Sequence, residues 1–300
     1  MKTNILYIII CLIFILTGCT QPNLLIQENE VKNNELQNNE KVSEYEKDSN
    51  IIKDYNLEIT FINVGQGDAI YLESNNQNML VDTGSSHNEI YLLEFLEDKN
   101  IEKIDYLVCT HMHEDHIGNA DEVLEKYKVE NIYLSKIEAD TKAFNNLKLA
   151  VDLELSSNIL YPEEGHTFYL GTSEITVLSA EKINNLNNSS IVLLIKNKED
   201  YILLTGDAEK EIEKKLVKEY YNILSEVDVL KVGHHGSYNS SCEEFISTIT
   251  PSYSVISYGE NNSYRHPHSE TIEILEKYES EIFLTTEGNI TFYSNGNSFD

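Results

Sequence analysis

Tryptophan is absent from this chain of 300 residues, and arginine occurs once, at Arg265. Aspartate and glutamate number 51 against 22 lysines and arginines, so the formal net charge is −29 at pH 7. A protein that follows nucleic acid usually carries a basic stripe, and no lysine–arginine cluster of that kind occurs here. The negative field should therefore repel polyanions, whereas a small phosphodiester is repelled less.

The first residues have the pattern of a bacterial lipoprotein. Met1-Lys2 is followed by the apolar run Ile5–Leu16, which is too short to span a bilayer comfortably, and Leu16-Thr17-Gly18-Cys19 looks like a lipobox. We expect residues 1–19 to be a signal peptide and Cys19 to become the lipidated N-terminus, with the membrane as partner. The protein would then lie on the outer face of the bacterial cytoplasmic membrane. An uncleaved anchor is the alternative, and it leaves the rest of the chain in the same compartment.

Residues 20–55 are rich in Asn, Glu, Lys and Gln and have few bulky apolar side chains, which predicts a disordered tether. Residues 56–300 are long enough for one substantial core and are expected to form a single domain. Cysteine is scarce: of four in the chain, only Cys109 and Cys242 fall within residues 56–300. They make no disulfide framework, and Cys109 is expected inside a buried strand.

Three imidazoles and the carboxylate of Asp115 stand close together in the segment His111-Met112-His113-Glu114-Asp115-His116. Neutral imidazole nitrogen and carboxylate oxygen suit zinc or manganese, so one or two divalent ions, Zn²⁺ or Mn²⁺, are expected. Residues i and i+2 of an extended chain project to the same side. His111 and His113 can therefore bind one ion, which leaves Asp115 and His116 to face a second. A polar surface loop that happens to be rich in histidine is the alternative.

The pattern His-x-His-x-Asp-His after an apolar strand resembles the hallmark of the metallo-β-lactamase superfamily, whose members are mostly hydrolases with one or two metal ions. Further segments occur in the order seen in the hydrolase domain of ComEC-type DNA-uptake proteins and their free-standing relatives. These segments are Phe61–Ala69, Leu80–Gly84, Leu204–Asp207, Lys231–Ser237 and His266–His268. The resemblance implies an α+β fold of the αββα type, a sandwich of two mixed β-sheets flanked by helices, with the metal loops at one edge.

The same resemblance implies roles for three aspartates. Asp207 would bridge the two metals with one oxygen on each ion, whereas the residues alone would equally allow it to cap a helix over 208–220. Asp68 and Asp82 close turns that contain glycine, where an aspartate commonly hydrogen-bonds its own turn. Their places in the family pattern imply that they support the metal-binding histidines from behind and are not ligands themselves.

Two adjacent histidines follow a strand expected at 227–232. Neighbouring side chains on an extended backbone point in opposite directions, so at most one of His234 and His235 should be a metal ligand. We expect His235 on the metal beside Asp115 and His116. His234 is then expected at a catalytic position with Asp115, contacting substrate or a supporting carboxylate. The choice between the two histidines stays open.

One departure from the superfamily concerns the first metal. Many members place its third histidine just before the strand that precedes the bridging aspartate, but residues 184–190 contain no histidine here. ComEC-type relatives also have Asn and Ser at this point. The site formed by His111 and His113 is therefore expected to be weak. His166 is the nearby substitute, and we interpret it as a loop histidine that introduces a strand at 167–170.

The segment Arg265-His266-Pro267-His268 precedes an expected helix at 269–278. It can be a surface loop in which Ser269 caps the helix. In the functional interpretation, His268 faces the metals from the rim as a catalytic residue, and Arg265 offers its forked donors to a phosphate oxygen. Family members carry His-Pro-His here, whereas the position of Arg265 is frequently occupied by another residue.

Strands and helices are expected to alternate along the remaining sequence. Strands are expected at 57–64, 69–73, 78–81, 104–110, 131–134, 167–170, 174–178, 190–196, 201–204, 227–232, 254–257, 282–285 and 290–293. Helices are expected at 89–98, 117–128, 139–150, 209–220, 243–249 and 269–278.

Three functions are compatible with these features. The first is a surface-anchored phosphodiesterase or nuclease, in which a metal-bound hydroxide attacks the phosphorus of a small phosphodiester or a nucleic acid. The second is hydrolysis of an amide, ester or lactam, although the missing histidine argues against a true β-lactamase. The third is a non-catalytic binding lipoprotein that holds metal, against which the intact set of Asp115, His116, Asp207 and His235 argues. The sequence indicates no protein partner.

Overall fold

The computed structural model describes residues 55–300. The expected signal peptide at 1–19, with Cys19, and all but the last residue of the expected tether at 20–55 lie outside the described residues. Within 55–300, no helix has both the length and the apolar character that crossing a membrane requires.

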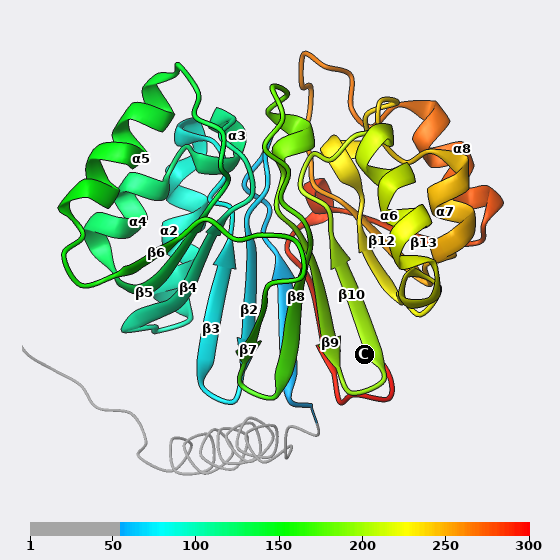
Figure 1. Cartoon of the computed structure of the whole chain (residues 1–300), viewed down its shortest axis with the longest axis horizontal. Helices are drawn as coiled ribbons and strands as arrows, with labels where there is room; N and C mark the ends of the chain where they lie inside the picture. Colours follow the sequence, from blue (N-terminus) through cyan, green and yellow to red (C-terminus); the bar gives the residue numbers. More distant parts are fainter. Residues whose placement is uncertain (1–54) are drawn as a thin grey trace, which may run out of the picture. The chain divides into compact units, whose positions relative to one another are not determined.

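The strands of this part form two mixed sheets of seven strands each (Figure 1). The first sheet has the order β14 (Ile290–Ser294), β1 (Leu57–Phe61), β2 (Ile70–Ser74), β3 (Gln77–Val81), β4 (Lys103–Cys109), β5 (Lys128–Leu134) and β6 (Asn158–Leu160). The second has the order β13 (Glu281–Leu284), β12 (Tyr253–Ile256), β11 (Val229–Lys231), β10 (Asp200–Leu204), β9 (Val192–Asn197), β8 (Ser173–Ser179) and β7 (Thr167–Leu170).

Each sheet is antiparallel on one side and parallel on the other. Strands β3 to β6 pair in parallel in the first sheet, and β10 to β13 do so in the second. Parallel strands bring their carboxyl ends to the same edge of a sheet, where binding loops usually gather. The predicted sandwich of two mixed sheets is confirmed.

Helices cover the outer face of each sheet (Figure 1). On the first sheet these are α2 (Glu89–Asp98), α4 (Ala120–Lys126) and α5 (Lys142–Leu153), and on the second α6 (Lys210–Leu224), α7 (Glu243–Ile249) and α8 (Ser269–Lys277). The single turn α3 (Glu114–Ile117) and the 3-10 turns η1 (Ser86–Asn88), η2 (Asn187–Ser189), η3 (Gly233–Gly236) and η4 (Thr285–Glu287) complete the described elements.

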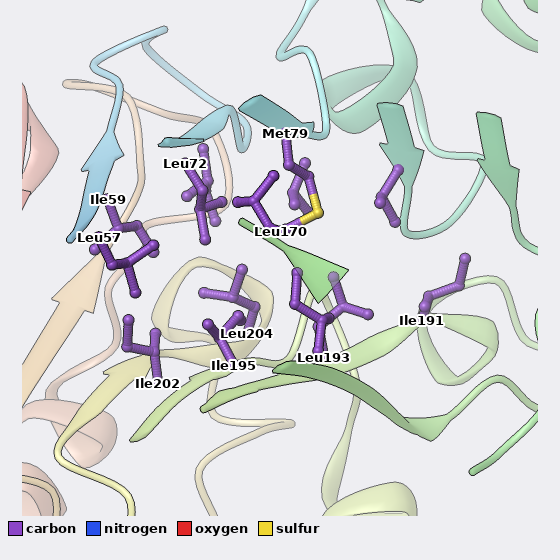
Figure 2. Packing of buried hydrophobic residues seen from close by; sticks show 14 of the residues in the cluster. Leu57, Ile59, Leu72, Met79, Leu170, Ile191, Leu193, Ile195, Ile202 and Leu204 are labelled. Atoms are coloured by element: carbon purple, nitrogen blue, oxygen red, sulfur yellow. The ribbon is translucent and has the colours of Figure 1, made fainter. Parts of the chain in front are cut away.

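Strand β9 contributes to two of the three apolar layers. Leu193 and Ile195 enter the core between the two sheets, whereas Val192 and Leu194 face the helices of the second sheet. Successive side chains of a strand point to opposite faces, so a nearly continuous apolar run buries both faces. Figure 2 shows the layer between the sheets, where Leu193 and Ile195 lie among apolar side chains of both sheets.

Most expected elements appear within a few residues of their predicted bounds, and two differences bear on the site. The helix expected at 117–128 is two pieces, α3 and α4, and helical structure begins three residues earlier than expected, at Glu114. The chain breaks between them because Gly118 N donates to Gly84 O at 2.9 Å and the side chain of Asn119 donates to Thr83 O at 2.7 Å. Strand β6 was not predicted.

Neither Asp207, for which helix capping was the alternative interpretation, nor Ser269, which was expected to be a cap, occupies an N-cap position. The residue at the N-cap position of α6 is Glu209, so Asp207 is not a helix cap. The N-cap position of α8 belongs to His268, and Ser269 is the first helical residue. Cys109 and Cys242 are free thiols, both buried. Cys109 lies in strand β4, as predicted, and is its last residue.

The layer between the sheets should dominate stability. Ile195→Ala should lower the free energy of unfolding by about 2–5 kcal/mol, because it removes a fully buried side chain from a packed core. The neighbouring Lys196→Ala, on an exposed side chain of the same strand, should cost less than about 1 kcal/mol. Urea unfolding of the two variants checks this, and equal costs would contradict the assignment of the two faces.

Candidate metal centre

The candidate ligands lie on loops that follow the carboxyl ends of parallel strands. Asp82 follows β3, and the segment His111–His116 follows β4 in the first sheet. Asp207 follows β10, and His234 and His235 follow β11 in the second. The two sheets therefore contribute to one site, which opens into a cavity of about 430 Å³.

Two groups of potential ligand atoms, each within 4.8 Å of one another, occur among the described residues. The smaller group contains His111, His113 and Asp207. His111 Nε2 and His113 Nδ1 lie 2.9 Å apart, and Asp207 Oδ2 lies 3.7 Å from His111 Nε2. Burial lowers the pKa of both histidines, so that each is neutral and able to offer a lone pair.

The larger group surrounds His116 and His235, whose Nε2 atoms lie 3.3 Å apart. Asp207 Oδ1 is 3.2 Å from His116 Nε2 and 3.6 Å from His235 Nε2. Asp115 Oδ2 is 3.3 Å from His235 Nε2. Asp207 thus turns one oxygen to each group, as a carboxylate that bridges two ions must do.

Hydrogen bonds at Nδ1 fix the orientation of the imidazole rings of His116 and His235. Asp82 Oδ2 accepts from His116 Nδ1 at 2.7 Å, and Asp82 also accepts from the backbone and hydroxyl of Thr110 at 2.7 and 2.6 Å. His235 Nδ1 donates to Ser257 O at 2.9 Å. Each ring must therefore present Nε2 to the centre, which is the usual arrangement of a metal-binding histidine.

Asp68 belongs to the larger group by distance, but its contacts place it behind the ligands. Its Oδ2 accepts from the buried Lys231 Nζ at 2.7 Å, and its Oδ1 approaches His235 at Nδ1, 3.4 Å away. Asp115, in contrast, meets His235 on the Nε2 side. Asp115 therefore lies on the side of His235 where a ligand of an ion bound to Nε2 would lie, whereas Asp68, paired with Lys231, lies where it can support the ring of His235. Burial alone would raise the pKa of Asp68, but Lys231 and His235 lower it to about 2.

The charges of this cluster fit a cation. Burial alone would lower the pKa of His235, but Asp207 and Asp68 raise it to about 10, and Asp207 and Asp82 likewise raise that of His116. Without metal, protons on these rings would balance the carboxylates, and a divalent ion would displace them. Asp207 Oδ1 is buried and has no hydrogen-bond partner in the described part of the chain. A bound cation would satisfy it, so the residues fit one or two divalent metal ions.

His234 and His235 do not lie on extended backbone, which corrects the argument made from the sequence. Both have left-handed conformations, with φ of 50° and 54°, in the turn η3. His235 is buried at the centre, whereas the side chain of His234 is 19% exposed and lines the cavity. Because neither residue is extended, their rings need not point in opposite directions, and both face the site.

Gly67 brings the loop before β2 against the metal loop. Its φ is +130°, and a Cβ at this position would lie 2.2 Å from the carbonyl oxygen of Asp115. Asp68 N donates to the same oxygen at 3.1 Å. A side chain at residue 67 would therefore displace the backbone that carries Asp115.

Three residues discussed from the sequence lie away from the centre. His166 contacts Tyr133, with 3.2 Å between Nε2 and the hydroxyl, and belongs to neither group of potential ligands. The Nδ1 of His268 accepts from Tyr238 N at 3.2 Å, and His268 does not line the cavity. Arg265 is exposed and does not line it either. We expected His268 and Arg265 to face the metal site, and neither lines its cavity in the structure.

The cavity contains residues that the sequence did not single out. His266 is 92% buried, lines the cavity in place of His268, and has an Nδ1 without a hydrogen-bond partner in the described residues. Tyr264 stacks on its ring at 5.5 Å between centroids. The remaining lining residues outside the ligand set are Gln66, Ser85, Glu114 and Thr141. Lys231 could have been recognised, since it is a charged side chain at the end of the short, otherwise apolar strand β11.

Comparison with known proteins finds relatives that match most of this chain. The chain is 33% identical over 257 residues to ComE operon protein 3 of Bacillus subtilis, covering 79% of this chain and 33% of that protein. It is 29% identical over 230 residues to Recombination protein 2 of Haemophilus influenzae, covering 75% of this chain and 27% of that protein. The chain therefore spans about a third or less of the length of these relatives.

Similarity to solved structures concerns the fold alone. CmlA, a diiron beta-hydroxylase from Streptomyces venezuelae, has a TM-score of 0.53 at 13% identity, covering 80% of this chain and 54% of that chain. A family model described as the metallo-beta-lactamase superfamily matches residues 62–260. These residues include every loop that carries a candidate ligand, and the chain accordingly belongs to the metallo-beta-lactamase superfamily.

Proposed function

We propose that the protein is a metal-dependent phosphodiesterase, anchored by lipid on Cys19 at the outer face of the bacterial cytoplasmic membrane. The position of Asp207 is the observation that most supports metal-dependent hydrolysis. Its two oxygens approach His111 on one side and His116 with His235 on the other, which suits a pair of ions close enough to act on one substrate. The similarity to Recombination protein 2 supports a phosphodiester as the substrate, because recombination acts on nucleic acid.

The chain's own residues would position the reaction. When bound, the divalent ions would supply a water of lowered pKa and neutralise charge that develops on phosphoryl oxygens. Burial alone would raise the pKa of Asp115, but His235 and His116 hold it below its usual range, so this carboxylate is ionised and can orient the attacking water. The buried side chain of Asp207 would hold the two ligand groups at a fixed distance from each other, because each of its oxygens faces one group.

His266 and Tyr264 supply the substrate side of the cavity. Burial and the nearby His235 lower the pKa of His266 to about 4, so its ring is neutral near pH 7. Its unpartnered Nδ1 can form a hydrogen bond with a substrate oxygen. Tyr264 is 61% exposed and offers an aromatic face beside it. A ring-bearing leaving group, such as a nucleoside or an aryl group, fits this wall.

The charge of the chain favours a small substrate. Among the described residues, none of those that line the cavity is a lysine or an arginine. With a formal net charge of −29, a polyanion would approach against the long-range field, and attraction would come from the bound ions alone. A small phosphodiester meets less repulsion, and we favour it over long nucleic acid.

The first test removes ligands. His116→Ala and Asp207→Ala should each reduce hydrolysis of bis-p-nitrophenyl phosphate by about 1,000-fold or more. Each variant should lose a bound ion, and that ion stabilises the transition state by several kcal/mol. Elemental analysis should show this loss of at least one metal ion. His87→Ala, on an 85% exposed side chain, should change neither. Unchanged metal content in both ligand variants would disprove the assignment, and wild-type turnover of a chromogenic lactam without phosphodiester cleavage would disprove the substrate class.

The second test uses ionic strength. Added salt screens repulsion between the chain and a polyanion, so kcat/KM for single-stranded DNA should rise between low and moderate salt at saturating Mn²⁺. Turnover of bis-p-nitrophenyl phosphate should stay nearly flat over the same range. Steady-state kinetics on both substrates provide the comparison. A steep fall with salt on DNA would indicate a basic binding track and contradict this model of the site.

The third test concerns the anchor. Cys19→Ala should release the protein into the medium or leave it as unprocessed precursor, because the lipid acceptor is lost. Fractionation of cells, with immunoblotting of membranes and medium, would measure this. Normal membrane retention of a processed Cys19→Ala chain would rule out lipidation, and an unchanged distribution of the matched Thr20→Ala variant would serve as control.

A further inference from the structure

The first metal group is short of protein ligands. His111 and His113 supply two imidazoles and Asp207 a shared carboxylate oxygen. Catalytic zinc sites usually have three protein ligands of their own, with water in the open position. The second group has two imidazoles, Asp115 and the other oxygen of Asp207. The first ion would therefore be held less firmly unless another residue completes its coordination.

His234 lies beside this incomplete group. Its Nε2 is 3.8 Å from Asp207 Oδ2, the same oxygen that lies 3.7 Å from His111 Nε2. Two atoms that bind one ion at about 2.1 Å are separated by roughly 3–3.5 Å, so 3.8 Å from Asp207 is slightly too long for a closed site. His234 also lies outside the group of His111, His113 and Asp207, whose ligand atoms are all within 4.8 Å of one another, so its ring would have to turn to join them. The side chain of His234 is 19% exposed at the cavity wall, which leaves its ring room to turn.

We propose that His234 Nε2 is the third protein ligand of the first metal. It would replace, from η3, the histidine that many superfamily members carry before the strand leading to the bridging aspartate. The left-handed backbone at both His234 and His235 lets consecutive residues serve the two ions, one each. The inference rests on the proposed metal site but not on the identity of the substrate.

The residues behind His234 suit this role. Glu209 Oε1 lies 3.7 Å from His234 Nδ1, and Asn187 Nδ2 donates to the same carboxylate oxygen at 3.1 Å. A small rotation of the ring toward Glu209 would let Nδ1 donate and leave Nε2 free for a metal, as carboxylates behind metal-binding histidines do. Asn187 belongs to the stretch where other members place their histidine. In this chain, that stretch holds Glu209 in place through the side-chain amide of Asn187.

Binding of Co²⁺ to the full chain tests the proposal, with visible absorption and calorimetry as readouts. The wild type should bind two equivalents. His234→Ala should weaken the first site by about 100-fold or more and leave the second unchanged, and added imidazole should restore part of the loss. Glu209→Gln, which removes only the carboxylate behind the ring, should weaken the same site by about 10-fold. His166→Ala is the matched control and should bind both equivalents normally.

Each other outcome decides against the proposal. Two unchanged Co²⁺ affinities in His234→Ala, with lower turnover, would assign His234 to substrate contact. Loss of the first site in His166→Ala would make His166 the missing ligand. Circular dichroism of the variants would separate a lost ligand from a lost fold. Absence of phosphodiester cleavage by the wild type would defeat the proposed function alone, because the metal titration needs no substrate.

Discussion

The carboxylate of Asp82 holds the end of β3 to the metal loop that leaves β4. One side chain accepts three hydrogen bonds, from the backbone and hydroxyl of Thr110 and from His116 Nδ1. The first two position the loop, and the third forces His116 to present Nε2 to the centre. His116 then meets Asp207, which arrives from the other sheet. Removal of this carboxylate would free both the start of the loop and the direction of its central histidine.

Local pattern predicted most of the fold because the strands are apolar and the helices have clear ends. Helix α7 and strand β7 have the bounds expected from the sequence, and the sandwich of two mixed sheets followed from the family resemblance. The gathering of the metal loops at one edge also followed from that resemblance. These features depend on short stretches of sequence, or on motifs that occur along the chain in the order typical of the family.

The remaining features depend on contacts between distant segments. An expected extended backbone at His234 and His235 gave the wrong geometry, because the left-handed turn is not encoded by a glycine at either residue. Whether His266 or His268 faces the cavity depends on how the loop packs against Tyr264 and Tyr238. The pairing of Lys231 with Asp68 joins residues 163 positions apart. No local periodicity carries such information.

Both metal groups take ligands from both sheets. His111, His113 and His116 come from the first, and Asp207 and His235 come from the second. The ligands would therefore separate if one sheet slid over the other by even an ångström or two, well before the apolar layer between them was exposed to water. Metal affinity therefore depends on how the two sheets are aligned. Substitutions deep between the sheets, far from any ligand, would weaken metal binding while the chain was still folded.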